Sequence, residues 1–184
     1  MIMKKILILF VLIILSIKYA SSQDLYIVSN GDVHFTSDAP LELIEAESNK
    51  LNGILKVSDR SFVFRVPMKT FEGFNSALQQ THFNENYLES AKYPHTIFEG
   101  KIIEEIDFNT PGTHNVRGKG SFTCHGVKQQ RIIRCRVSVG QNKITVKTDF
   151  SVLLEDHNIK IPSVVSQKIA EEITVDVNLE LVPK

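Results

Sequence analysis

The chain has 184 residues, with 21 lysines and arginines against 21 aspartates and glutamates. This balance argues against a nucleic-acid-binding protein, which usually carries a strongly basic surface. The length suits one domain that buries a substantial core without disulfides or metals.

Residues 1–22 have the composition of a secretory signal peptide. Two lysines precede an apolar run from residue 6 to residue 15, and Ala20 and Ser22 occupy the two small-residue positions of a cleavage site. The alternative is an uncleaved membrane anchor, which needs roughly 20 apolar residues. We therefore expect export, to the periplasm or the extracellular medium, of a single domain formed by residues 23–184.

Most of this domain alternates between apolar and polar residues, which is the period of a strand with one buried face. The alternation is clearest from Ile173 to Leu181, and turn residues such as those at 109–112 separate successive runs. Together the runs predict an all-β, antiparallel fold, either an eight-stranded barrel or a sandwich. The expected strands cover residues 25–37 (bulged at Asn30-Gly31), 41–47, 54–57, 61–68, 96–107, 113–124, 129–139, 143–154 and 173–181.

The alternation is interrupted after the fourth expected strand, between Phe71 and Phe98. Ser76 and Gln79 fit a capping box, and Pro94 disfavours helical backbone at the residue before it. The spacing of the apolar residues predicts one or two short helices with one apolar face. That face consists of Phe74, Leu78, Phe83, Tyr87 and Leu88. We expect this insert to lie against one end of a barrel, as its closed end or its gate.

Two cysteines in an exported protein suggest a disulfide, but their positions argue against one. Cys124 and Cys135 flank a hairpin turn near His125-Gly126-Val127-Lys128, so Cys135 should lie opposite about position 118. An offset of several residues is far beyond disulfide reach. Both cysteines share the parity of apolar neighbours, which predicts two buried free thiols.

No motif in the sequence indicates catalysis. The six histidines are dispersed without the spacing of a helical metal site, and no Gly-x-Ser-x-Gly occurs. Cys124 and His125 are adjacent on a strand and point to opposite faces, which disfavours a cysteine–histidine nucleophile. We predict no catalytic residue, no metal site and no enzymatic activity. An enzyme on such a barrel would need a cluster of polar groups inside it.

An ordered set of segments resembles the YceI-like family of exported, lipocalin-like, polyisoprenoid-binding proteins. It comprises 83–94, which ends in Glu-Ser-Ala-Lys-Tyr-Pro, the strand opening at 96–98, the strand and turn at 116–127, Asp-Phe-Ser at 149–151, and the segment 159–177. The resemblance spans nearly the whole exported part of the chain. It implies an eight-stranded antiparallel barrel, of the lipocalin-like type, whose interior takes a long apolar chain such as a polyisoprenoid or a quinone tail.

A barrel of eight strands is either filled by side chains or wide enough for one small ligand. The resemblance favours a cavity for an apolar lipid, and no other cofactor is expected. The alternative is a filled barrel that binds a protein or a cell-surface partner. The residues expected to line the barrel are Phe35, Phe62, Phe64, Met68, Phe74, Leu78, Phe83, Tyr87, Phe98, Phe122, Val146 and Phe150. His82 and Arg131 are the candidates for contacting a headgroup, Arg131 because its parity is inward near a strand end.

An outward basic patch is the remaining candidate surface. It consists of Arg117, Lys119, Lys128, Arg134 and Arg136. Such a set is either a solvated face or a contact with anionic headgroups at a membrane surface. The sequence leaves a monomer and a homodimer open.

Overall fold

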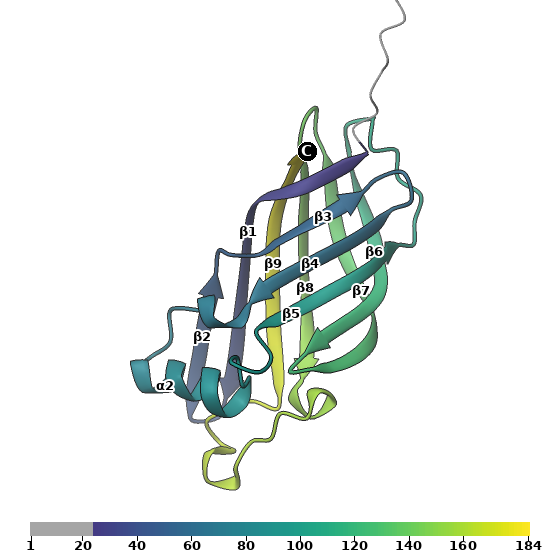
Figure 1. Cartoon of the computed structure of the whole chain (residues 1–184). Coiled ribbons are helices and arrows are strands. Elements are labelled where there is room, and N and C mark those ends of the chain that lie inside the picture. Colours follow the sequence, from purple (N-terminus) through teal and green to yellow (C-terminus); the bar gives the residue numbers. More distant parts are fainter. Residues whose placement is uncertain (1–23) are drawn as a thin grey trace, which may run out of the picture.

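Antiparallel strands make up most of this computed structural model, which describes residues 24–184 (Figure 1). The expected signal peptide lies outside the described residues. The strands are β1 (Leu25–Ala39), β2 (Glu42–Ser48), β3 (Asn52–Lys56), β4 (Ser61–Pro67), β5 (His95–Ile102), β6 (Gly112–Cys124), β7 (Val127–Val139), β8 (Ile144–Leu153) and β9 (Glu172–Pro183). The helical elements are η1 (Met68–Thr70), α2 (Ala77–His82), the π-helical turn η2 (Phe83–Tyr87), η3 (Leu154–His157) and η4 (Ser163–Val165).

The sheet closes into a barrel because β1 pairs with β9 as well as with its neighbours in sequence. β1 and the seven strands from β3 to β9 complete an eight-stranded antiparallel ring, which confirms the barrel and excludes the sandwich. The first residues of β1 pair with β3, and its last residues pair with β2. β2 therefore continues the wall beyond the end of β3, and the helical insert follows β4 as predicted.

Two details of the strands differ from the sequence prediction. The register of β1 against β9 shifts between Val28 and Asn30, so the bulge lies one residue earlier than expected. β5 ends at Ile102 rather than at residue 107. The Asp107 carboxylate there accepts hydrogen bonds from the Asn109 backbone and the Thr110 hydroxyl, and it holds the chain in a turn.

The hairpin between β6 and β7 turns in two residues, His125 and Gly126, which have φ of 49° and 73°. Positive φ at both positions is the geometry of a tight hairpin turn. Because this turn is shorter than the predicted one, Cys135 lies opposite Val116 rather than position 118. Both cysteines are free; Cys124 is buried, whereas Cys135 is only half-buried.

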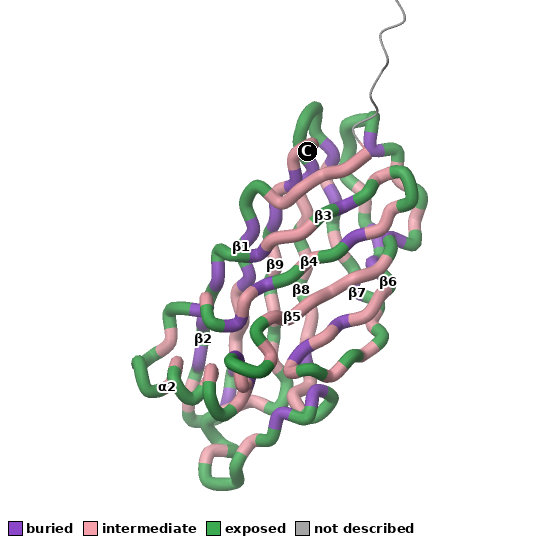
Figure 2. Tube along the Cα trace, viewed as in Figure 1, coloured by how far each residue is buried: buried purple, intermediate pink, exposed green. Residues whose placement is uncertain are grey.

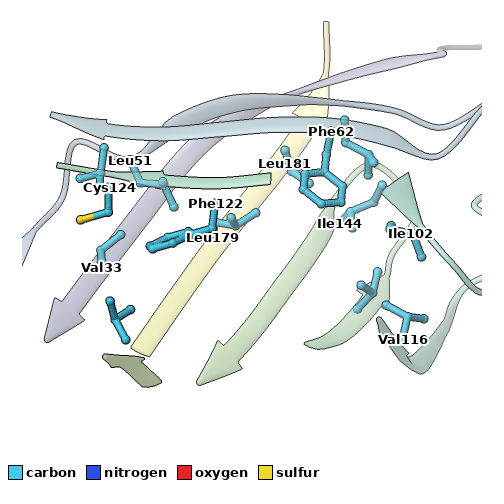
Figure 3. Packing of buried hydrophobic residues seen from close by; sticks show 14 of the residues in the cluster. Val33, Leu51, Phe62, Ile102, Val116, Phe122, Cys124, Ile144, Leu179 and Leu181 are labelled. Atoms are coloured by element: carbon cyan, nitrogen blue, oxygen red, sulfur yellow. The ribbon is translucent and has the colours of Figure 1, made fainter. Parts of the chain in front are cut away.

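One end of the barrel is tightly packed, and we call it the packed end. The strand ends that meet there carry Leu55, Ile144 and Leu181, which are almost inaccessible to solvent. The β5–β6 connection adds Phe108, which is buried in the same core cluster. In Figure 3, Ile144 and Leu181 gather with Phe62 at one side of the view, whereas Val33 and Cys124 lie at the other. The opposite end carries α2 and the long β8–β9 connection, where exposed residues predominate (Figure 2).

Candidate ligand cavity

A cavity of about 500 Å³ occupies the barrel interior. This volume lies within the roughly 300–1,000 Å³ of small-molecule sites. All twelve residues predicted to line the barrel do line it: Phe35, Phe62, Phe64, Met68, Phe74, Leu78, Phe83, Tyr87, Phe98, Phe122, Val146 and Phe150. Their contact with a ligand stays a prediction.

Sequence reasoning missed many further apolar residues of the wall. Examples are Val33 on β1, Phe71 in the insert and Ile133 on β7, together with Val175 and Leu179 on β9. The alternation of β9 indicates that Val175 and Leu179 face inward, because alternate residues of a barrel strand point to the same side of the wall. Phe71 follows η1 and belongs to no strand, so its inward position depends on tertiary structure.

Phenylalanine rings form two groups along the cavity. The deeper group links β4, β5, β6 and β8: the ring of Phe98 lies 5.0 Å from that of Phe62 and 6.4 Å from that of Phe122, and Phe150 lies 5.8 Å from Phe122. Such separations suit edge-to-face and tilted packing of aromatic rings. These rings leave the interior apolar and polarizable over its middle section.

The second group holds the helical insert against β1. Phe35 stacks on Phe83 at 5.4 Å with an interplanar angle of 12°. Phe71 and Phe74 pack against both of these rings. Three aromatic side chains of the insert therefore pack on Phe35 of the barrel, and two of them, Phe74 and Phe83, belong to its predicted apolar face. Leu78 of that predicted face is instead 63% exposed.

The start of α2 has the predicted cap. The Ser76 hydroxyl accepts a hydrogen bond from the Gln79 amide at 3.2 Å. The Gln79 side-chain oxygen accepts from the amide of Asn75, one residue before the position of an ordinary capping box. The helix then widens into η2 without a break, so the insert is one continuous helical segment rather than two separate helices.

Polar residues surround the end of the cavity beside α2, which we call the mouth. Glu42 of β2 accepts a hydrogen bond from the Gln79 amide group at 3.0 Å, and its other carboxylate oxygen lies 4.0 Å from Lys168 Nζ. His82 is exposed in the last turn of α2 and also lines the cavity. The cavity is thus apolar inside and polar at its rim. His82 is the one predicted headgroup residue that lies at this rim.

Arg131, the other headgroup candidate, lies outside the set of lining residues. Its guanidinium donates a hydrogen bond to the Ser151 carbonyl at 2.6 Å. This contact arises because β7 and β8 pair only from Arg136–Lys147 to Val139–Ile144 and separate beyond that point. A role of Arg131 in headgroup binding stays a prediction.

The separation of β7 and β8 forms a seam in the barrel wall. Side chains bridge it: besides Arg131, the Thr148 hydroxyl donates to the Arg134 carbonyl at 2.7 Å. An outer groove of about 630 Å³ lies over the seam and shares Cys135, Thr148 and Val177 with the cavity. The wall between the cavity and the outer surface is therefore thin at this seam, where three residues line both sides.

The predicted basic patch is divided by carboxylates of neighbouring strands. Arg117 pairs with Glu104 at 2.7 Å, and Lys128 pairs with Glu99 at 2.9 Å. Arg134 and Arg136 line the outer groove, but Asp149 and Asp176 line the same groove. The alternation placed the five basic side chains outward correctly, but it gave no information on which strand would lie beside them.

Comparison with known proteins decides the family. The sequence matches the family model described as the YceI-like domain over residues 29–181. The chain belongs to the YceI-like family. This agrees with the resemblance seen in the sequence.

Solved structures share this YceI-like fold at low sequence identity. A polyisoprenoid-binding domain from Saccharophagus degradans superposes with a TM-score of 0.73 at 12% identity, covering 86% of this chain and 98% of that one. BcnA from Burkholderia cenocepacia gives 0.67 at 15% identity, with 82% and 95% covered. The Campylobacter jejuni YceI protein gives 0.56 at 14%, with 73% and 81% covered. A search of curated protein sequences found no match.

A buried histidine connects η3 to the β6–β7 hairpin at the mouth end of this YceI-like barrel. His157 is fully buried, and its Nδ1 lies 3.2 Å from the Cys124 carbonyl and 3.3 Å from the Val127 carbonyl. Nδ1 therefore carries the proton, and Nε2 has no partner within residues 24–184. Burial lowers the pKa of His157 below its usual range. The ring is neutral and structural, a role that the dispersed histidines of the sequence did not indicate.

Neither a metal site nor a spanning helix is found in the described part of the chain. Residues 24–184 contain no group of three or more histidine, cysteine or acidic residues arranged to hold a metal ion. No helix within the same residues is long and apolar enough to cross a membrane.

Proposed function

We propose that this YceI-like protein is a non-enzymatic lipid-binding protein that holds a polyisoprenoid or quinone-like chain inside its barrel. Carriage or sequestration of such a lipid after export, in the periplasm or outside the cell, is the role that we infer. The observation that carries the proposal is the cavity, which has an apolar wall and a polar mouth at one end.

The binding energy of such a ligand would come from its tail. Apolar surface contributes roughly 25 cal/mol per Å² removed from water, or about 0.8 kcal/mol per buried CH₂, before ordering costs are subtracted. Because this hydrophobic contribution has no directional requirement, the cavity would accept tails of different structure. It would favour longer tails up to the length that fills the cavity. The polar rim, with Glu42, Gln79 and His82, would then discriminate between headgroups.

The distribution of charge supports binding rather than catalysis. Among the described residues that line the cavity, formal charges are limited to Glu42, Arg65 and Lys168, and the last two are exposed. A catalytic site needs convergent titratable groups beside the bound substrate. The likeness to a polyisoprenoid-binding domain from another organism supports the same class of ligand. A filled barrel, the alternative reading, is disfavoured by the volume of the cavity.

Lipid uptake by delipidated protein tests the proposal. The full exported chain would be incubated with a polyprenyl alcohol or with ubiquinone in detergent and examined by native mass spectrometry. We expect one lipid per barrel, and weaker uptake by Val146→Trp, which places an indole in the cavity. A mass that stays at that of the free protein with every prenyl and quinone lipid would contradict the proposal.

A further inference from the structure

Large apolar side chains are exposed around the mouth. Leu41, Leu78 and Val164 are 67%, 63% and 88% exposed, more than any other large hydrophobic residue within 24–184. Exposed leucines are common singly on protein surfaces, but a group at one place usually marks an interaction site. The three residues come from three separate segments: the β1–β2 turn, α2 and η4.

Hydrogen bonds hold these three segments together. The Leu41 amide donates to the Gln167 carbonyl at 2.9 Å, which joins the β1–β2 turn to the connection that carries η4. The contact between Gln79 and Glu42 joins α2 to the start of β2. Figure 1 shows α2 and this connection at the same end of the barrel. Leu78 also lines the cavity, as does Val165 beside Val164, so the exposed group borders the opening itself.

Two lysines flank Val164, the most exposed of these tips, at a spacing of four residues on either side. Residues 157–170 carry Lys160 and Lys168 and no carboxylate, and residues 73–84 carry neither lysine, arginine nor carboxylate. Asp38 and Glu42 flank the β1–β2 turn, and Glu42 lies 4.0 Å from Lys168, whereas Lys160 belongs to none of the ion pairs of residues 24–184. Apolar tips beside lysines are typical of segments that lie in the interface of an anionic bilayer.

We propose that Leu41, Leu78 and Val164 form a docking surface that places the mouth on a bilayer containing anionic lipid. The proposal rests on the lipid-binding function, because a mouth seated in the interface would let an apolar chain pass between bilayer and cavity without crossing water. The occupant is thus a membrane surface, and a second copy of the chain is the alternative that the test must exclude.

The sequence contains no tryptophan, so a single substitution provides an unambiguous fluorescence reporter. Val164→Trp places an indole at the most exposed tip, and tryptophan favours the bilayer interface. Ile132→Trp is the matched control, because Ile132 is 56% exposed on β7 opposite Lys119 of the basic patch and would therefore report vesicle binding through that patch instead. Each variant would be titrated with vesicles of phosphatidylcholine with or without phosphatidylglycerol.

We expect the emission of Val164→Trp to shift to shorter wavelength with phosphatidylglycerol vesicles, and that of Ile132→Trp to stay unchanged. Adding Lys160→Gln to the reporter should weaken partitioning about fivefold, since one lysine near an anionic surface contributes about 1 kcal/mol. No shift at residue 164, or an equal shift at both residues, would overturn the docking surface. A shift at residue 164 that depends on protein concentration without vesicles would identify a dimer interface instead.

Uptake of a polyprenyl alcohol from detergent, measured on the same samples, separates this inference from the proposed function. Uptake without any vesicle-induced shift would overturn the docking surface alone. A shift at residue 164 without uptake from detergent or vesicles would overturn the proposed function and leave the docking surface in place.

Discussion

The packed end and the mouth of the barrel are built from different kinds of contact. At the packed end, Ile144 and Leu181 lie opposite each other on paired strands and are 1% and 0% exposed. At the mouth, polar side chains and exposed apolar tips surround the cavity, and the Leu78 side chain lies largely in solvent. The comparison indicates that the packed end provides stability and that the mouth serves binding. The predictions below test this division.

Truncating one leucine at each end should give the largest contrast. Leu181→Ala should lower the free energy of unfolding by about 2–5 kcal/mol, because a buried leucine leaves a void when it is shortened. Leu78→Ala should change it by no more than about 0.5 kcal/mol. Urea denaturation of both variants measures the difference. Equal losses would show that the mouth is as important for stability as the packed end.

The reactivity of Cys135 should report on the seam, because Cys135 lines both the cavity and the outer groove. Burial, followed by the nearby Glu104 carboxylate, raises the pKa of this thiol from 9.0 to about 11. Because the thiolate is the reactive form, alkylation near pH 8 should be about a hundredfold slower than in the urea-unfolded chain. The rate should rise about tenfold per pH unit until the pKa is reached.

Burial raises the pKa of Cys124 as well, so Cys124 serves as the less accessible internal reference. A bound lipid should slow the reaction of Cys135 further, and alkylation as fast as in urea would contradict this account of the seam.

Two inward residues of β8 distinguish a packed region from a cavity wall. Ile144 is 1% exposed and outside the set of lining residues, whereas Val146, two residues further, lines the cavity. Ile144→Trp should cost about 1–3 kcal/mol of unfolding free energy through overpacking. Val146→Trp should cost less, because the indole enters free space, and it should reduce lipid uptake. The filled-barrel alternative would be supported by a larger loss of stability in Val146→Trp than in Ile144→Trp.

His157 should make the mouth end sensitive to acid. Its pKa is lowered in the fold, so the unfolded chain binds a proton more readily as pH falls below about 6.5. The unfolding free energy should then decrease with falling pH, by up to about 1.4 kcal/mol per unit. This loss should be smaller in His157→Phe when stabilities at about pH 7.5 and about pH 5.5 are compared. An unchanged pH dependence in His157→Phe would assign the effect to other groups.

The sequence predicted the antiparallel strands and their inward faces well because both depend on local periodicity. The choice of a barrel over a sandwich came from the resemblance to the YceI-like family. The position of a residue along an alternating strand determines which face it occupies, so residues such as Phe122 and Phe150 were placed on the cavity wall correctly. Ser76 likewise capped α2 as expected, because capping needs only a few neighbouring residues.

Features that depend on how distant strands meet were not predicted. The seam exists because β7 and β8 diverge after four paired positions, and no residue type in either strand indicates where pairing stops. For the same reason, Arg131 had the expected parity but bonds to Ser151 across the seam. Glu42 and Lys168 reach the mouth from segments far apart in the chain, so their proximity required the closed barrel.

The most direct test of the account is a crystal structure of the protein purified from its native source without detergent. We predict elongated electron density inside the barrel, running from the rim at Leu78 and His82 past Phe150 toward Leu179. Mass spectrometry of the dissolved crystals should identify an isoprenoid or quinone lipid. A cavity that contains only ordered water, or that side chains fill, would contradict the central claim that the barrel holds an apolar chain.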